Sequence, residues 1–257
     1  MTTALVTGAT SGIGAGFADR YARLGYHLVL VARDEQRLRT KADELHDRWH
    51  VEVEVLPADL SSDDECARVE ARLLDDTRPI GVLVNNAGYS LGVDVVESDV
   101  EAEDRMLRVL TRAPLRLTKA ALPGMLARNR GTIITVSSVA GIISYNSYGA
   151  AKAWALKFSQ ALSLRLANTD VRAIALCPGL VHTEFHERSG VDASAAPRFM
   201  WLTVDRVVDE CLRDLAKGKA ISVPSRRYRV LVGVGARLPS NFTARIARNR
   251  GVRSRRG

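Results

Sequence analysis

Residues 3–35 read TALVTGATSGIGAGFADRYARLGYHLVLVARDE, in which two aliphatic runs enclose a turn with glycines at positions 8, 12 and 14. At a strand–turn–helix junction, the first backbone N–H groups of the helix face the turn and favour an anion. Gly8 can form the tight turn, Gly12 can let a pyrophosphate approach the backbone, and Gly14 can let the helix pack on the strand. The spacing is G-x-x-x-G-x-G, so a plain strand–helix turn is the alternative interpretation.

The same alternation of apolar runs and helical patterns continues along the chain. Strands are expected at residues 4–8, 27–32, 51–59, 81–88, 131–138, 171–179 and 220–224. Helices are expected near residues 12–24, 34–49, 63–76, 97–128, 148–167 and 203–217. Continuous apolar strands separated by helices favour a parallel sheet that is covered on both faces. The sequence therefore predicts an α/β fold, a Rossmann-like doubly wound parallel sheet flanked by helices, in a single three-layer α/β/α domain.

Positive charge is concentrated at the C-terminal end of the chain. The net charge is +8, and residues 225–257 contain ten arginines, no lysine and no acidic residue. We therefore divide the chain into a Rossmann-like α/β domain, 1–224, and a basic apolar extension, 225–257. Three interpretations of the extension remain open: partial disorder, packing on the body or on a partner subunit, and peripheral contact with an anionic membrane. Specific nucleic-acid binding is not expected, because the arginines accompany no motif that reads bases.

Composition also bears on the compartment. The 257 residues include three widely spaced cysteines, without a C-x-x-C pair. Such cysteines indicate buried thiols in a reducing compartment, so we expect a cytoplasmic protein. We expect no metal site, because His182 and His186 have no evident third ligand.

Arg33 stands at the end of the second apolar run. An acidic residue there would bind the ribose 2′-hydroxyl of NAD, whereas an arginine can accommodate a 2′-phosphate. The sequence therefore favours NADP(H) over NAD(H), with Arg37 one helical turn further on as a second candidate. The alternative is a solvated arginine at the start of a helix.

Tyr148 and Lys152 are four residues apart and would lie on one face of a helix. A lysine ammonium beside a phenol favours the phenolate, so this tyrosine can exchange a proton while hydride moves to or from a carbonyl carbon. A serine at the end of the preceding strand can hold the carbonyl oxygen. Ser138 is favoured for this role, and Ser137 is the rival assignment. A pair on the surface of the helix is the alternative.

Taken together, the motifs resemble those of the short-chain dehydrogenase/reductase family over residues 3–185, and they occur in the family's order. They are TGATSGIG (7–14), DL (59–60), NNAG (85–88), the Ser138–Tyr148–Lys152 set and PGLVHT (178–183). The resemblance implies an NADP-preferring oxidoreductase that interconverts a carbonyl and a secondary alcohol. It implies cofactor contacts by Gly8, Thr10, Ser11, Gly12, Ile13, Gly14, Arg33, Asp59, Leu60, Asn86, Ala87, Gly88, Tyr148, Lys152, Pro178, Gly179, Val181 and Thr183. It also implies that Tyr148 is the acid/base, that Lys152 binds the nicotinamide ribose, and that the chain forms a homodimer or homotetramer.

The chain departs from the family at two points. The family usually has an asparagine thirteen residues before the proline of an LP pair, whereas Leu110 stands there in this chain. Ser138 precedes Tyr148 by only ten residues, so the intervening loop should be short. A leucine side chain cannot hold a proton-relay water, and the alternative function is therefore a weakly catalytic NADPH-binding regulator or scaffold.

By the same resemblance, residues 184–203 form the substrate lid. Phe185, Phe199, Met200 and Trp201 are the candidate pocket residues. They predict a lipophilic small molecule of the steroid, acyl or aromatic type. Ordinary packing of a long loop is the alternative.

Overall fold

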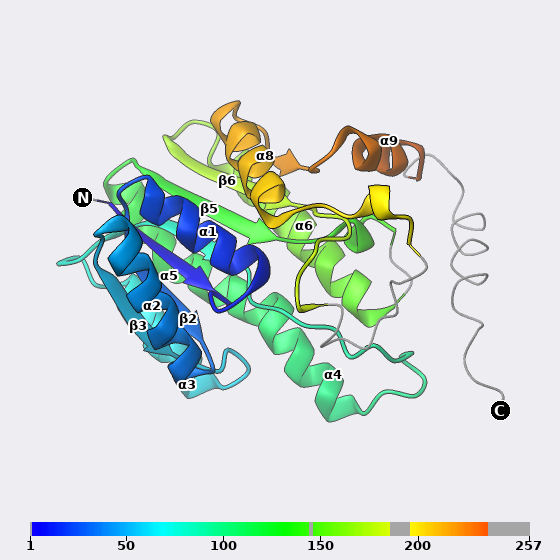
Figure 1. The fold of residues 1–257 in the computed structure, drawn as a ribbon, viewed down its shortest axis with the longest axis horizontal. Coiled ribbons are helices and arrows are strands. Elements are labelled where there is room, and N and C mark those ends of the chain that lie inside the picture. The colour runs from blue at the N-terminus through cyan, green and yellow to red at the C-terminus, as the bar shows by residue number, and fades with distance from the viewer. Residues whose placement is uncertain (1, 144–145, 186–195, 236–257) are drawn as a thin grey trace.

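Seven strands pair in parallel in the order β3-β2-β1-β4-β5-β6-β7 in the computed structural model, which describes residues 2–143, 146–185 and 196–235 (Figure 1). The strands are β1 Thr3–Thr7, β2 His27–Ala32, β3 Val53–Pro57, β4 Ile80–Asn85, β5 Gly131–Val136, β6 Val171–Leu176 and β7 Ile221–Ser222. The sheet order reverses between β1 and β4, so the carboxyl ends of these two strands lie at the switch point where open α/β sheets bind ligands.

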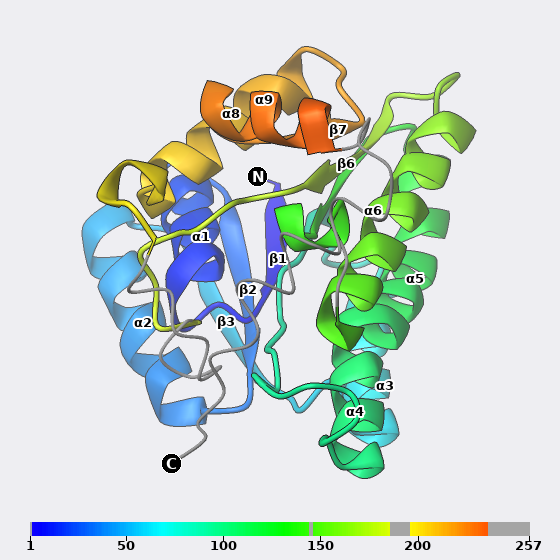
Figure 2. The same ribbon diagram turned by 90° about the vertical axis from the view of Figure 1, so that its right-hand side faces the viewer.

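Helices cover both faces of the sheet. They are α1 Gly12–Arg23, α2 Glu35–Trp49, α3 Asp63–Leu73, α4 Val100–Leu107, α5 Ala113–Ala127, α6 Ser147–Arg165, α8 Val204–Ala216 and α9 Arg226–Gly235. Helices α1, α2 and α8 pack on one face, and α3, α5 and α6 pack on the other (Figure 2). The predicted three-layer, Rossmann-like, doubly wound sheet is confirmed.

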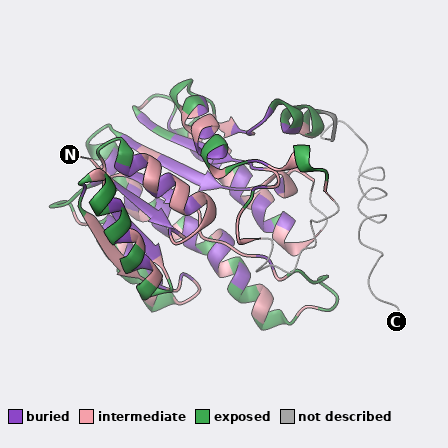
Figure 3. Ribbon diagram, in the orientation of Figure 1, coloured by how far each residue is buried: buried purple, intermediate pink, exposed green. Residues whose placement is uncertain are grey.

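The strand interiors form the core between the two helical layers (Figure 3). Leu28, Val29, Leu30 and Val31 of β2 are consecutive, and none is more than 1% exposed. Alternate side chains of a strand point to opposite faces, so such a run requires a covering layer on each side. The unbroken aliphatic pattern is thus a direct consequence of the α/β/α arrangement.

The helix expected over residues 97–128 is interrupted. Helix α4 ends at Leu107, a single π-helical turn spans Arg108–Arg112, and α5 follows. Pro114 lies at the start of α5 and has no N–H to donate to the carbonyl of Leu110, four residues earlier. Periodicity predicted one helix because apolar side chains continue through the interruption.

The basic extension begins with α9, which is drawn in the upper part of both views and is linked to α8 by an ion pair between Arg229 and Glu210 (Figures 1 and 2). Tyr228 of α9 is buried and belongs to the same core cluster as α1 and α8. The extension beyond residue 235 lies outside the described residues. Over the ranges that the structure describes, no helix has the length and hydropathy needed to cross a membrane.

Candidate active site

The glycine turn lies between β1 and α1, and neighbouring atoms leave no room for a side chain at the positions of its glycines. Gly8 and Gly12 have φ values of +66° and +56°, in the left-handed region that favours glycine. A Cβ atom on Gly8 would lie 2.8 Å from Nδ2 of Asn86, and one on Gly14 would lie 2.2 Å from the Gly8 carbonyl oxygen. The roles expected for Gly8 and Gly14 in turn formation and close packing therefore have a steric basis.

The N-terminus of α1 lacks the side-chain cap that five other helices have, and it is open at the glycine turn, whereas α5, which also lacks a side-chain cap, continues directly from the π-helical turn. Asp34, Ser62, Asp99, Asn146 and Thr203 cap α2, α3, α4, α6 and α8 with their side chains. Ser11 occupies the same position on α1 but makes no such hydrogen bond within the described chain, and the first turn has no acidic residue. The first N–H groups of α1 are therefore suited to an anion, and the turn fits the pyrophosphate of a dinucleotide.

Residues after β4 brace this turn. Asn86 donates from Nδ2 to the carbonyls of Thr7 (2.9 Å) and Gly8 (3.2 Å). The backbone N–H groups of Asn86 and Ala87 donate to Oγ1 of Thr7, both at 3.0 Å. Asn86 was predicted as a cofactor contact, and the geometry shows its amide holding the turn in shape. Thr7 was not among the predicted site residues, because its role depends on β4 lying beside β1.

The candidate adenosine side contains two arginines with different surroundings. Arg33 follows β2, is exposed and has no ion pair among the residues that the structure describes. Arg37 instead donates from Nη2 to Oε1 of Glu184 (2.9 Å) and to the carbonyl of Thr10 (3.4 Å). Hydrogen bonding to Glu184 raises the pKa of Arg37. Arg33 is therefore the more available cation for a 2′-phosphate, and sequence reasoning missed the partner of Arg37.

Asp59 and Leu60 follow β3 on the same side of the site. The Asp59 carboxylate accepts hydrogen bonds at Oδ1 from the backbone N–H (2.9 Å) and Oγ (2.8 Å) of Ser61. Leu60 is buried. Asp59 is thus held in one orientation by its own loop.

Lys152 is a buried cation next to the candidate acid/base. It lies on α6, is 5% exposed and donates from Nζ to the carbonyl of Val136 (2.7 Å). Burial lowers the pKa of Lys152 to about 8. Nζ is 5.7 Å from the ring centroid of Tyr148, which is half-buried. The i, i+4 spacing has therefore brought the two groups together on the inner side of α6, and the alternative of an exposed surface pair is wrong.

The two serines after β5 have different roles in the packing. Ser137 is buried and donates from Oγ to the carbonyl of Lys152 (2.6 Å), which joins β5 to α6. Ser138 is less buried, and its Oγ accepts from the N–H of Ala140 (3.1 Å), so its own proton remains available to a ligand. A Cβ atom on Gly141 would lie 2.6 Å from the carbonyl carbon of Lys152, and this close approach allows the short loop before Tyr148.

Leu110 fills the position of the family's asparagine with hydrocarbon. It is 1% exposed on the π-helical turn and packs with Met106 and Ala151, against which Tyr148 also lies. A Cβ atom on Gly88 would lie 2.7 Å from Cδ2 of Leu110, so Gly88 provides the space for this leucine.

The segment after β6 crosses the glycine turn toward the candidate catalytic groups. The Thr183 methyl would be 3.0 Å from a Cβ atom on Gly12, and Phe185 packs on Tyr148 with ring centroids 5.8 Å apart. Trp201 stacks on His182, with centroids 4.8 Å apart. Residues 186–195 of the expected lid lie outside the described residues.

The lid residues predicted to line the pocket do not all behave alike. Phe185 reaches Tyr148, whereas Phe199 is 59% exposed and lies under the guanidinium of Arg227. Met200 packs against the core on the α1 and α8 side of the sheet. The structure therefore brings Phe185 to the reacting groups and leaves Phe199 on the surface.

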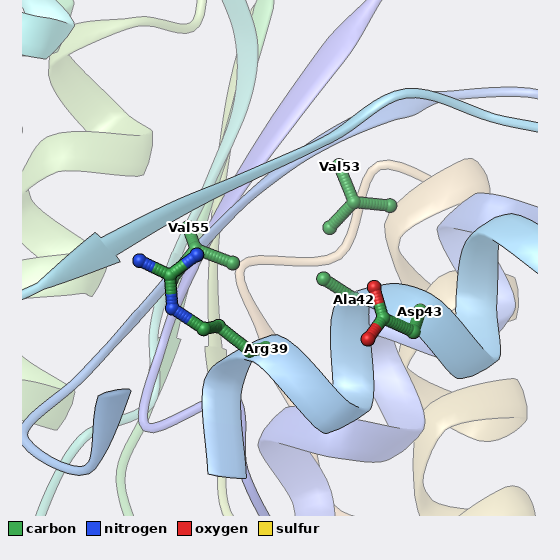
Figure 4. A pocket seen from close by; sticks show the side chains of 5 residues that line it. All are labelled: Arg39, Ala42, Asp43, Val53 and Val55. Atoms are coloured by element: carbon green, nitrogen blue, oxygen red, sulfur yellow. The ribbon is translucent and has the colours of Figure 1, made fainter. Parts of the chain in front are cut away.

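A surface hollow of about 370 Å³ lies elsewhere, between α2 and the edge strand β3 (Figure 4). It is lined by Arg39, Ala42, Asp43, Val53 and Val55. None of these residues belongs to the glycine turn or to the Ser138–Tyr148–Lys152 set, so the hollow is not part of the candidate site.

Known proteins share both the sequence pattern and the fold. Residues 2–193 match the family described as short chain dehydrogenase. The NADP-dependent 3-hydroxy acid dehydrogenase YdfG of Salmonella typhi is 40% identical over 188 residues, which cover 70% of this chain and 73% of the relative.

Two solved structures extend the likeness to the whole chain. A short-chain dehydrogenase from Sphingobium yanoikuyae in complex with NADPH aligns with a TM-score of 0.84 and 35% identity, covering 100% of this chain and 98% of its own. The bulky-bulky ketone specific alcohol dehydrogenase from Comamonas testosteroni aligns with a TM-score of 0.79 and 31% identity, covering 100% and 97%.

Proposed function

The chain belongs to the short chain dehydrogenase family and is an NAD(P)(H)-dependent oxidoreductase of alcohols and carbonyls; from that premise, we propose that it prefers NADP(H) and acts on a bulky lipophilic substrate. The observation that carries the proposal is the buried Lys152 beside Tyr148, with Phe185 packed on the tyrosine ring. This arrangement places a proton-transfer group against an apolar wall.

The bound nicotinamide supplies or accepts the hydride, and the chain's own residues manage the proton and the substrate oxygen. Tyr148 gives a proton to the carbonyl oxygen during reduction and takes it back during oxidation. Lys152 stabilises the phenolate electrostatically when it is protonated, and it binds the nicotinamide ribose. Ser138 donates its remaining proton to the substrate oxygen, which orients the carbonyl for transfer.

The glycine turn and the segments around it would hold the cofactor. The uncapped start of α1 receives the pyrophosphate, with Thr10, Ser11 and Ile13 beside it. Asp59 and Leu60 would hold the adenine, and the 87–88 and 178–183 segments would hold the nicotinamide half. The preference for NADP(H) rests on Arg33, and it agrees with the NADP dependence of the Salmonella protein and with the NADPH complex of the Sphingobium protein.

A bulky lipophilic carbonyl or alcohol is the proposed substrate class. Phe185 lies at the start of the proposed lid at 184–203, and Trp201 lies near its end, where it stacks on His182. The bulky-bulky ketone specificity of the Comamonas enzyme supports a substrate that is bulky on both sides of the carbonyl.

We also infer a reducing, cytoplasmic location and a homo-oligomer. Cys66, Cys177 and Cys211 are all free and buried, as expected of a protein that needs no disulfide. Homo-oligomerisation and membrane contact by the arginine-rich tail are open to gel filtration and to vesicle binding at two salt concentrations.

Cofactor preference is tested by fluorescence titration of NADPH and NADH. We expect NADPH to bind wild type at least about tenfold more tightly than NADH, equivalent to about 1.4 kcal/mol, and Arg33→Ala to lose that margin. Arg39→Ala is the matched control, because Arg39 is an exposed arginine of α2 that pairs with Glu35. An undiminished margin in Arg33→Ala contradicts the assignment of Arg33.

The catalytic assignment is tested with Tyr148→Phe, in a screen of bulky aryl ketones with NADPH. Removal of the phenol proton should lower turnover by a factor of about 100 or more, with NADPH binding close to wild type. Turnover that survives this substitution would show that another group exchanges the proton. NADPH binding without turnover in wild type would instead support the regulatory alternative.

A further inference from the structure

Tyr228 links the two segments that border the substrate side of the site. It is 5% exposed and lies on α9, beyond the residues that match the family. Its hydroxyl oxygen accepts from the backbone N–H of Leu180 (2.9 Å), and its hydroxyl proton goes to the carbonyl of Met200 (2.9 Å). One buried hydroxyl therefore satisfies a donor from the segment after β6 and an acceptor from the far end of the lid.

The ring of Tyr228 lies directly on Gly179. A Cβ atom at Gly179 would lie 1.9 Å from Cζ of the tyrosine, a distance that no side chain can occupy. A glycine at this position was expected from the cofactor motif. The contact with Tyr228 is a second reason for glycine at position 179, and this reason applies only to a chain that has an aromatic ring at position 228.

The residue before Tyr228 holds the neighbouring part of the lid. Arg227 donates from Nη1 to the carbonyl of Phe199 (2.9 Å), and its guanidinium carbon is 5.2 Å from the centroid of the Phe199 ring. Adjacent residues of α9 thus bind adjacent carbonyls of the lid, at Phe199 and Met200.

Helix α9 is itself fixed to the body of the domain. The backbone N–H of Ser225 donates to Oε2 of Glu210 on α8 (2.9 Å), and Nη2 of Arg229 is 3.8 Å from the same oxygen. Ser225 has a φ of +79°, so the chain turns sharply before α9 begins. The position of α8 is therefore transmitted through α9 to the lid.

The two segments joined by Tyr228 also pair with each other. Leu202 donates its N–H to the carbonyl of Leu180 (2.9 Å), and His182 donates to the carbonyl of Leu202 (3.0 Å). Thr183 and Phe185 follow directly and meet Gly12 and Tyr148. A change in the position of Leu180 would therefore move the groups that border the nicotinamide and the substrate.

We propose that Tyr228 is a positioning residue that fixes the 179–183 segment and the 198–202 end of the lid in the arrangement needed for the nicotinamide and the substrate. The expected effect of Tyr228 on ligand binding rests on the proposed function. Its expected effect on the order of the 179–183 and 198–202 segments does not rest on that function, so the test can separate a failure of the positioning role from a failure of the proposed function.

The test compares Tyr228→Phe with Tyr21→Phe. Both remove the hydroxyl of a buried tyrosine, and Tyr21 lies in the core between α1 and β2. Hydrogen exchange without cofactor should rise about fivefold or more in peptides covering 178–183 and 198–203 of Tyr228→Phe, and not in Tyr21→Phe. Arg227→Ala should accelerate exchange in 198–203 alone.

Ligand binding adds a second measurement, the affinity for 2′,5′-ADP compared with the affinity for NADPH. A general loss of stability would not change one of these affinities without the other. In Tyr228→Phe, the affinity for 2′,5′-ADP, which contains only the adenosine half, should stay within about twofold of wild type. The affinity for NADPH should fall about threefold or more, and the KM should rise about fivefold or more for the bulky aryl ketone that wild type reduces fastest in the screen.

The outcomes separate the two proposals. Unchanged exchange at 178–183 and 198–203 in Tyr228→Phe overturns the positioning role, whatever the activity. Equal losses of 2′,5′-ADP and NADPH affinity also overturn it, because they indicate a general defect. A wild-type protein that binds no NADPH contradicts the proposed function, while the exchange contrast still decides the role of Tyr228.

Discussion

Replacing Lys152 with methionine should stabilise the protein at neutral pH, although it removes a proposed catalytic group. The Lys152 side chain is 5% exposed, and within the described part of the chain its Nζ has one hydrogen-bond acceptor, the backbone carbonyl of Val136. Burial in these surroundings disfavours the ammonium form and lowers the pKa of Lys152 from 10.5 to about 8. At neutral pH, the folded state must therefore carry a buried charge that the unfolded chain carries in water.

The size of this effect follows from the two pKa values. A lysine pKa of about 8 in the folded state and 10.5 in the unfolded state corresponds to about 3 kcal/mol of stability. Between these two pKa values the folded state binds fewer protons at Lys152 than the unfolded state does. The contribution of Lys152 to the free energy of unfolding is therefore fully present above pH 10.5 and is lost as the pH falls through about 8. The free energy of unfolding of wild type should thus be lowered at neutral pH by the buried charge, whereas that of the methionine variant should not.

Urea unfolding of wild type and Lys152→Met across the alkaline range measures this difference. The free energy of unfolding of the variant minus that of wild type should fall by about 2 kcal/mol between about pH 7 and about pH 9.5. Loss of the hydrogen bond to Val136 adds only a constant offset. Lys157→Met controls for removal of an exposed lysine from the same helix. A difference that stays constant with pH would refute the buried-charge argument.

Two further substitutions, Gly14→Ala and Leu110→Ala, test the packing around the site, and Gly233→Ala serves as a glycine control. Gly14→Ala should destabilise the protein by about 2–4 kcal/mol in thermal unfolding, because its Cβ atom would lie 2.2 Å from the Gly8 carbonyl oxygen. Gly233→Ala, whose added Cβ atom has nothing within 4 Å in α9, should instead be neutral or stabilising by up to about 1 kcal/mol. Leu110→Ala should cost about 2–5 kcal/mol in urea unfolding, since the leucine is 1% exposed, and a loss below about 1 kcal/mol would contradict its place in the apolar cluster.

The fold was predictable because its determinants are local in the sequence. The run at 28–31 is aliphatic at every position, and such a run fits a strand that is covered on both faces. Gly8 and Gly12 mark the turn because their φ values are positive, a property that the residue type largely encodes. The pairing of Tyr148 with Lys152 was likewise predictable, since one helix carries both residues.

The contacts that complete the site were not predictable, because they join distant parts of the chain. Tyr228 meets Leu180 across 48 positions, and Arg37 meets Glu184 across 147. Neither contact has a local pattern, and an arginine-rich segment after residue 224 looks like a solvated tail. The arrangement of β6, α8 and α9 decides which residues of that segment become buried.

Leu110 shows how a sequence departure can be misjudged from side chains alone. The leucine suggests the loss of a polar relay, and its side chain is indeed enclosed by Met106 and Ala151. The main chain at Leu110 is affected by another residue. Pro114 has no N–H, so the carbonyl of Leu110 cannot accept the α-helical hydrogen bond from the residue four positions ahead. The missing N–H of Pro114 gives a backbone reason for the interruption of the α-helix at Arg108–Arg112, where a π-helical turn stands. With leucine at position 110, the interruption of the helix is still present, and the main-chain carbonyl of Leu110 is a polar group beside the apolar cluster.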